Sequence, residues 1–320
     1  MANIITDITL VSSTLILTSM LITMYKIPML VFTLMLVGGC AQQRSVSLVP
    51  ADTLLNNVSY SSVLALPVAD TGQKLDYGAE PLQFGRLFLP ASASTTTPVP
   101  LVIFVHGGCW LNAYDLQHSN AFSNALSQEG FAVWSVEYRR TGDSGGGWPG
   151  SLDDIRQAIF FSRSLAAYGV KTNNVRLVGH SAGGHLALLV SATKQTEQNT
   201  NSINDSIKSV IGLAAITDIT AYAAGDNSCQ RAALQFMNGN ALQKPQAYLQ
   251  ANPVKQPLHA SAILLHGDAD SIVEPAQAMA TNRPYQLVSG AGHFDWIHPQ
   301  TEAYKLFLTT LKQSIVNETP

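Results

Sequence analysis

An α/β fold with a mostly parallel central sheet is predicted for this 320-residue chain, on three observations. Short apolar segments recur along its middle and C-terminal parts. Segments with helical periodicity separate them, which is the alternation expected of βαβ units. The composition, 46% hydrophobic and 12% charged, lets the chain bury one large core. Helices are therefore expected to flank the sheet.

The first predicted strands precede the middle of the chain. Alternating apolar residues in 83–90 (QFGRLFLP) indicate a strand, and a Ser/Thr/Pro-rich loop follows it. The apolar runs 101–105 (LVIFV) and 131–138 (FAVWSVEY) are typical of buried strands. Helical periodicity predicts helices near 115–129 and at 151–168, after each of these runs.

The same alternation continues towards the C-terminus. It predicts, in order, a strand at 175–179, a helix at 181–193, strands at 209–215 and 262–267, a helix near 275–281, a short strand at 285–289 and a closing helix near 300–315. Residues 216–261 lie between two of these strands and are numerous enough for a small helical cap.

The first forty residues differ in composition from the rest. Between Met1 and Cys40 the only charged side chains are Asp7 and Lys26. The segment MYKIPMLVFTLMLVGGC, which begins at Met24, has one basic residue, an apolar run and small residues before a cysteine, the layout of a cleaved secretory signal. It resembles a bacterial lipoprotein signal. This resemblance implies lipidation of Cys40 and an exported protein anchored to a membrane of the cell envelope.

An uncleaved membrane anchor is the alternative, because residues 8–39 are long enough to span a bilayer. Lys26 in the middle of that stretch weighs against it. Residues 1–23 lack the basic region with which a signal begins, so translation is expected to start further downstream. Either interpretation exports the domain that follows.

Three parts are therefore expected along the chain. A signal segment occupies 1–40, a polar and irregular tether occupies 41–74, and one α/β catalytic domain occupies 75–320. The formal net charge of -3 and the lack of Lys/Arg clusters argue against a nucleic-acid partner. The sequence does not predict the oligomeric state.

Besides Cys40 the chain has two cysteines, Cys109 and Cys229. Two thiols of an exported protein can form a disulfide. Buried free cysteines also behave as small hydrophobic residues. The sequence leaves both possibilities open.

Two serines lie between glycines, in GDSGGG (142–147) and in GHSAGG (179–184). A chymotrypsin-like enzyme built on Ser144 would need β-hairpins and a His and an Asp before the serine, which the α/β pattern does not supply. GDSGGG is therefore interpreted as a loop. Ser181 follows a predicted strand and opens a predicted helix, as the nucleophile elbow G-x-S-x-G requires.

Three more motifs follow predicted strands. HGG at 106–108 follows LVIFV, where hydrolases with this elbow keep the loop that donates N–H groups to an oxyanion. Asp270 follows the strand at 262–267, and His293 follows the short strand at 285–289. The chain order Ser, Asp, His is the order found with this elbow.

On the strings HGGCW, VEYR (136–139) and GHSAGG, residues 75 to 315 resemble the α/β-hydrolase fold, in its esterase/lipase branch with an HGG oxyanion loop. Small carboxylesterases and the kynurenine-formamidase group are most similar. The resemblance implies Ser181 as nucleophile, His293 as base and Asp270 as its orienting acid, without metal or cofactor. It implies an oxyanion hole made by the amides of Gly108, Cys109 and Ala182. Cys109 departs from the HGGG of many lipases, which changes the pocket lining and leaves the amide in place.

Nearby polar residues have other expected roles. Asp268 competes with Asp270 for the acid role; family spacing favours Asp270 and leaves Asp268 to the turn. The remaining candidates are interpreted as structural: His106, His180 and His185, which lack metal-ligand spacing; Asp218 and Asp295 as loop or capping residues; and Glu137 with Arg139 as an ion pair.

The predicted activity is hydrolysis of a small ester through an acyl-enzyme on Ser181. Short-chain or aromatic carboxylic esters are the expected substrates, with Trp110 and Trp148 lining a narrow pocket. An arylformamidase or peptidase, which differs in leaving group, stays open. So does a lipid-anchored binding protein that has lost activity, because fold does not imply function.

Overall fold

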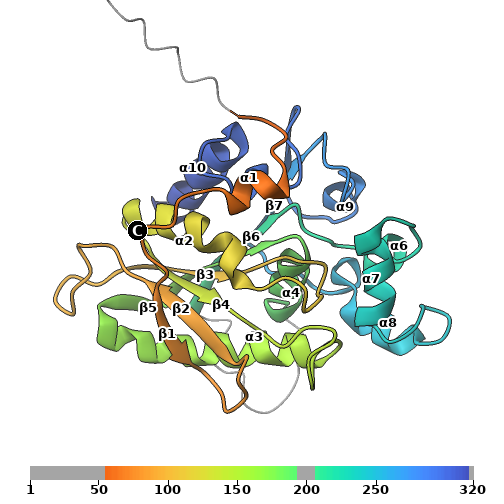
Figure 1. Cartoon of the computed structure of the whole chain (residues 1–320), viewed down its shortest axis with the longest axis horizontal. Helices are drawn as coiled ribbons and strands as arrows, with labels where there is room; N and C mark the ends of the chain where they lie inside the picture. Colours follow the sequence, from red (N-terminus) through yellow and green to blue (C-terminus); the bar gives the residue numbers. More distant parts are fainter. Residues whose placement is uncertain (1–54, 193–205, 317–320) are drawn as a thin grey trace, which may run out of the picture. The chain divides into compact units, whose positions relative to one another are not determined.

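The fold is organised by a mostly parallel sheet (Figure 1). The structure, a computed structural model, describes residues 55–192 and 206–316, all within the compact unit Ala51–Pro320. Its strands are β1 (Gln73–Asp76), β2 (Phe84–Phe88), β3 (Val99–Val105), β4 (Ala132–Val136), β5 (Val170–His180), β6 (Ile207–Leu213), β7 (Ala262–Gly267) and β8 (Tyr285–Val288). Cys40 and the segment 1–40 lie outside the described residues, so the signal and its lipidation stay predictions.

The strand order across this sheet is β1-β2-β4-β3-β5-β6-β7-β8. The pairs from β4 to β8 are parallel, and β1 and β2 join one edge antiparallel. In parallel strands the carboxyl ends meet at one edge of the sheet, where open α/β sheets bind their ligands. The loops that follow β3, β5, β7 and β8 therefore gather there, and they carry the motifs found in the sequence.

The central strands are buried on both faces, which explains their continuous apolar runs. Along β3, Leu101, Ile103 and Val105 belong to one core cluster, whereas Val102 and Phe104 belong to the other. Figure 1 shows α3 on one side of the sheet and α2 and α10 on the other. The helices required to cover both faces are thus present.

The helical segments, with η for 3₁₀ helices, are α1 (Tyr60–Leu64), η1 (Leu116–Ser119), α2 (Asn120–Gln128), α3 (Gly150–Phe161), η2 (Ser162–Tyr168), α4 (Ala182–Val190), α6 (Ile219–Tyr222), α7 (Ser228–Phe236), α8 (Pro245–Ala251), η3 (Pro253–Lys255), α9 (Ala276–Met279), η4 (Asp295–Ile297) and α10 (Glu302–Val316). Within residues 55–192 and 206–316, none of them is long and apolar enough to cross a membrane.

The segment between β6 and β7 forms the small helical cap that the sequence predicts. It consists of α6, α7, α8 and η3, and its three α-helices lie together at one end of the sheet (Figure 1). Asp218 caps α6 by accepting the N–H groups of Thr220 and Ala221. Asn227 and Gln230 form a capping box at the start of α7. Asp218 is thus a capping residue, as expected.

Residues 55–74, the described part of the expected tether, pack on the folded unit. Leu55 forms a β-bridge with Thr301, and β1 pairs with β2. The carboxylate of Asp295 accepts the N–H groups of Asn57 and Val58 at 2.7 and 2.6 Å. These backbone groups find partners only on the folded domain, which local composition does not reveal. The domain boundary expected at residue 75 therefore lies earlier in the chain.

Candidate active site

Ser181 lies on a sharp turn between β5 and α4. Its backbone has φ 55° and ψ −121°, a conformation that a residue with a side chain rarely adopts. The turn requires glycine at position 183, because a Cβ there would lie only 2.1 Å from the carbonyl oxygen of Val105. A larger residue at 183 would therefore force the turn away from β3. This geometry is the strained elbow that GHSAGG predicts.

His293 and Asp270 are brought together although they lie on different loops. His293 Nδ1 and Asp270 Oδ2 are 2.7 Å apart, and both side chains are buried. Since the ionised carboxylate can only accept, Nδ1 of His293 donates this bond. The other oxygen of Asp270 accepts the N–H groups of Ile272 and Val273, each at 2.9 Å. Asp270 is thus held by its own turn while it orients His293.

Opposing effects act on the pKa of Asp270. Burial alone raises this pKa, but His293, through its charge and its hydrogen bond, the amide of Val273 and the nearby His266 together bring it below its ordinary value. The carboxylate therefore stays ionised at neutral pH, as is needed to stabilise a protonated imidazole.

Asp268 does not compete for this role in the structure. Its Oδ1 accepts the N–H of Gly290 at 2.6 Å and so closes the turn between the loops that follow β7 and β8. This is the turn role expected for Asp268.

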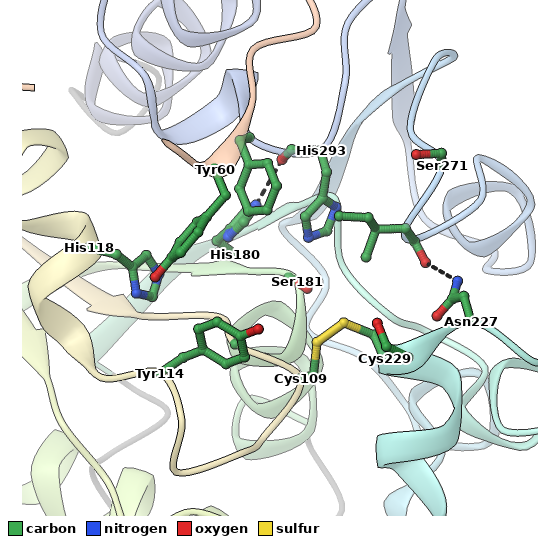
Figure 2. A pocket seen from close by; sticks show the side chains of 14 residues that line it. Tyr60, Cys109, Tyr114, His118, His180, Ser181, Asn227, Cys229, Ser271 and His293 are labelled. Carbon is green, nitrogen blue, oxygen red and sulfur yellow. Dashed lines mark hydrogen bonds between the residues drawn. A yellow bond between two sulfur atoms is a disulfide. The ribbon is translucent and has the colours of Figure 1, made fainter. Parts of the chain in front are cut away.

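Ser181 and His293 line one cavity of about 300 Å³ (Figure 2). Among the described residues, the hydroxyl and the imidazole share this cavity without a hydrogen bond between them. Such bonds often tighten only when substrate binds. The cavity is lined by Tyr60, Gly108, Cys109, Tyr114, His118, His180, Ser181, Asn227, Ser228, Cys229, Ser271, Ile272, His293 and Phe294.

The loop after β3 brings Gly108 and Cys109 to this cavity. Gly108, Cys109 and Trp110 all have positive φ, at 113°, 52° and 58°. A Cβ at Gly108 would lie 2.5 Å from Cβ of Tyr114, so glycine is needed here for space as well as for φ. Ala182 begins α4, where the first N–H groups have no acceptor within the helix. Gly108 and Cys109 thus line the same cavity as Ser181, and Ala182 follows Ser181 in the chain.

Cys109 and Cys229 form a disulfide with a Cα–Cα distance of 5.1 Å. This resolves the pairing that the sequence left open. The bond joins the loop after β3 to helix α7 of the cap, and both cysteines line the cavity (Figure 2). The cap is therefore covalently attached beside the candidate oxyanion hole.

The expectation that Trp110 and Trp148 line the pocket is wrong. Trp110 is fully buried and stacks on Phe236 at a ring distance of 4.9 Å. Trp148 is partly buried and meets the same phenylalanine edge-on at 6.3 Å. The positive φ of Trp110 turns its side chain into the core below the loop. The aromatic side chains that do line the cavity are Tyr60, Tyr114, His118, His180, His293 and Phe294.

Tyr60 is the lining residue that sequence reasoning missed. It comes from α1, in the segment assigned to the tether. Its neighbours in sequence are polar and carry no motif, so no local signal marks it. Contacts far away in the sequence, among them the attachment of Asn57 and Val58 to Asp295, place it in the cavity.

The other histidines hold loops in place, as expected. His180 Nε2 donates to the carbonyl of His293 at 2.9 Å, and burial holds the pKa of His180 well below its ordinary value. His185 Nε2 bonds the carbonyl of Ala251 at 2.7 Å. His106 Nε2 lies 3.1 Å from Glu137. Among the described residues, no group of three or more His, Cys, Asp or Glu side chains is placed so that it could hold a metal ion.

The expected ion pair between Glu137 and Arg139 is wrong. Glu137 contacts His106 and Arg140 and accepts the N–H of Leu116, whereas Arg139 pairs with Asp154. Both residues lie beyond the end of β4 at Val136, and their side chains contact different elements: Glu137 lies beside His106 and the start of η1, and Arg139 lies beside α3.

The model of the family described as BD-FAE matches residues 86–283, more than half of the chain. This chain belongs to the BD-FAE family. BD-FAE is an α/β-hydrolase esterase family, so the fold predicted from the elbow and the strand alternation is confirmed.

Curated relatives of this BD-FAE member include two named esterases. Esterase LipC of Mycobacterium tuberculosis is 25% identical over 74% of this chain and 64% of its own length. The isoprenylcysteine alpha-carbonyl methylesterase ICME of Arabidopsis thaliana is 27% identical over 68% of this chain and 55% of its own length. The chain thus spans about half to two thirds of these relatives.

Solved structures share the BD-FAE member's fold. Esterase B from Lactobacillus rhamnosis superposes with a TM-score of 0.66 at 21% identity, covering 80% of this chain and 90% of that one. A truncated carbohydrate esterase from gut microbiota gives a TM-score of 0.62 at 20% identity, covering 78% and 98%. These matches establish the architecture.

Proposed function

We propose that this protein hydrolyses carboxylic esters through an acyl-enzyme on Ser181. The observation that carries the proposal is the hydrogen-bonded pair of His293 and Asp270, which reaches the cavity that contains Ser181 on its strained turn. The esterase names of LipC and ICME support the same reaction class.

The geometry supports acyl transfer in two halves. Nε2 of His293 accepts the proton of Ser181 as Oγ attacks the ester carbonyl, and then gives it to the departing alcohol. Water repeats the sequence on the acyl-enzyme and releases the acid. The amides of Gly108, Cys109 and Ala182 would hold the oxyanion, and the start of α4 adds favourable potential there. The ionised Asp270 would stabilise the imidazolium formed in each half.

Short-chain or aromatic carboxylic esters are the proposed substrates. A cavity of about 300 Å³ lies at the small end of the range for ligand pockets. Its walls consist largely of aromatic rings, the disulfide and Ile272. Such walls favour a small or flat acyl group over a long flexible chain.

The test is a panel of p-nitrophenyl esters of increasing acyl length, an aryl carboxylate ester and an N-formyl aryl amide. The expected result is the highest kcat/KM on a short or aromatic ester. A serine-directed phosphonate is expected to label one peptide, and mass spectrometry should place the adduct on Ser181. If the formamide were hydrolysed as fast as the best ester, the enzyme would be an arylformamidase instead.

We also propose that the domain is exported and anchored to a membrane through a lipid on Cys40. This proposal rests on the signal-like segment that ends in LVGGC. It is independent of the chemistry proposed for Ser181.

A further inference from the structure

A second cavity adjoins the one that contains Ser181. It has a volume of about 560 Å³ and shares three lining residues with the first cavity: Tyr60, Tyr114 and His118. Its other walls are more polar and consist of Leu64, Val68, Thr71, Asn112, Ala113, Asp115, Gln117, Asn120 and Arg140. The three shared side chains therefore form a partition between the reaction cavity and a larger space beyond it.

Tyr60 is the centre of this partition. Its ring lies 5.8 Å from Tyr114 and 5.8 Å from His118, both edge-on, and 5.3 Å from Phe294. Figure 2 shows Tyr60 beside His118 and near Tyr114, on the side of the cavity away from the disulfide. One side chain thus connects the loop after β3, helix η1 and the loop that carries His293.

The other partition residues are parts of deeper structure. Tyr114 packs against Gly108, whose missing Cβ leaves room for it. His118 is buried, and its ring faces His106 at 5.6 Å. Tyr60 is only partly buried and comes from a short surface helix. Of the three partition residues, Tyr60 is therefore the one whose ring can be replaced with the least change to the buried groups around Gly108 and His106.

The position of Tyr60 is set by the segment that carries it. Asp295, which is fully buried, accepts the N–H groups of Asn57 and Val58. Ser59 then caps α1 by accepting the N–H of Ser62. Because Asp295 is two residues from His293, the partition is fastened to the same loop as the candidate base. The ring of Tyr60 should therefore stay in place while substrate binds.

We propose that Tyr60 is a specificity-determining residue that closes the reaction cavity towards the second cavity and so limits the size of the ester that reacts. This inference rests on the proposed esterase function. Replacing the ring with a methyl group would join the two cavities. Longer substrates would then extend past the partition while their carbonyl stays at Ser181.

The test compares Tyr60→Ala with Tyr60→Phe, which keeps the ring. Two ester series are used: p-nitrophenyl esters of increasing acyl length, and acetates of increasingly large alcohols. Each newly buried methylene is expected to raise kcat/KM about fourfold. For Tyr60→Ala, the ratio of kcat/KM for the long ester to that for the short one should therefore rise at least about tenfold in one series, chiefly through a lower KM. Tyr60→Phe should keep the wild-type ratio.

A second variant tests whether Tyr60→Ala acts by joining the two cavities or by making the reaction cavity less rigid. Ala113 lines only the second cavity and is exposed, so a tryptophan there fills that space. Adding Ala113→Trp to Tyr60→Ala should return the ratio towards the wild-type value. The exposed Tyr285 on β8 lies outside both cavities, and Tyr285→Ala is the matched control for the loss of a tyrosine.

The outcomes distinguish the proposed role of Tyr60 from the proposed esterase function. If the wild type hydrolyses esters and Tyr60→Ala, shown to be folded by its melting curve, keeps the wild-type ratio in both series, the inference is overturned alone. A ratio that rises in Tyr60→Ala but does not fall again with Ala113→Trp also overturns it, because the second cavity would not be the space used. A wild type inactive on every ester overturns the proposed function together with this inference.

Discussion

Ser181 and Ser144 differ in everything except their glycine neighbours. Ser181 is buried on the turn before α4 and lines the same cavity as His293, whereas Ser144 is exposed in a loop. We expect Ser181→Ala to lower kcat/KM on the best ester by several orders of magnitude, because the members of a triad act as a unit. Ser144→Ala should retain wild-type activity. Assay of both purified variants tests the assignment, and the reverse result would overturn it.

Asp270 and Asp268 offer a similar comparison on one loop. Asp270→Asn removes the carboxylate that holds the tautomer of His293, so we expect a loss of kcat of about 10⁴, as for the equivalent change in other triads. Asp268→Asn affects only the bond to Gly290 and should be milder. The kcat values of the two variants at neutral pH decide this. Equally mild losses would show that the acid has been assigned to the wrong residue.

Among individual residues, the sequence predicts those whose place in the site is set by the end of a strand. Ser181, Asp270 and His293 lie in the loops that follow the ends of β5, β7 and β8, and parallel strands bring such loops together. Tyr60 could not be found, because its place depends on hydrogen bonds to Asp295, far away in the sequence. The inward direction of Trp110 depends on its positive φ, which its residue type does not indicate.

Helix α7 and the loop after β3 are joined by the disulfide of Cys109 and Cys229. The bond closes a loop with a sequence separation of 120 residues, for which a chain-entropy model gives about 4 to 5 kcal/mol of stabilisation. Cys229→Ser should lower the free energy of unfolding by about 2 to 5 kcal/mol. It should also reduce kcat, because Cys109 contributes a candidate oxyanion amide.

Urea unfolding and ester kinetics, each with and without a thiol reductant, check this prediction. The reductant should affect the wild type as the substitution does, and it should add nothing to Cys229→Ser. A fully reduced wild type with unchanged kcat would show that the bond does not position the loop.

Helix α4 carries His185 into the core, where burial lowers its pKa to about 4. The unfolded chain takes up this proton near pH 6.5 and the folded protein only near pH 4, so stability falls as the pH drops between these values. The loss reaches about 3 kcal/mol at the acid end. His185→Gln, which does not titrate, should lose less stability than the wild type between pH 7 and pH 4.5 in urea unfolding. An equal loss would contradict this prediction.

Among the elements, the buried strands were the most predictable, because their apolar runs are long and β-branched. The helix expected at 151–168 is present but changes to a 3₁₀ helix at Ser162. Strand β1 was missed, since three of its four residues are exposed and it has no alternating pattern. β1 is held in the sheet by its pairing with β2, although its own sequence has no strand pattern.

For the whole molecule, the proposed lipid anchor predicts separable location and chemistry. Cys40→Ser should move the protein from the membrane fraction to the soluble fraction, because the modified thiol is lost. Ester hydrolysis in the lysate should be unchanged, since the site is built from residues 60–294. Fractionation with immunoblotting tests this. A wild-type protein that carries no lipid and still retains residues 1–39 would favour the uncleaved anchor.

The disulfide also makes the chain a covalent ring from Cys109 to Cys229, and Ser181 lies within it. A single protease cut anywhere in this ring leaves both fragments attached to each other. Such a nicked molecule would migrate as one intact species on a non-reducing gel and separate into two only after reduction. Whenever the cut falls between Ser181 and Cys229, the candidate nucleophile and the pair of Asp270 and His293 would be on different fragments that the disulfide holds together.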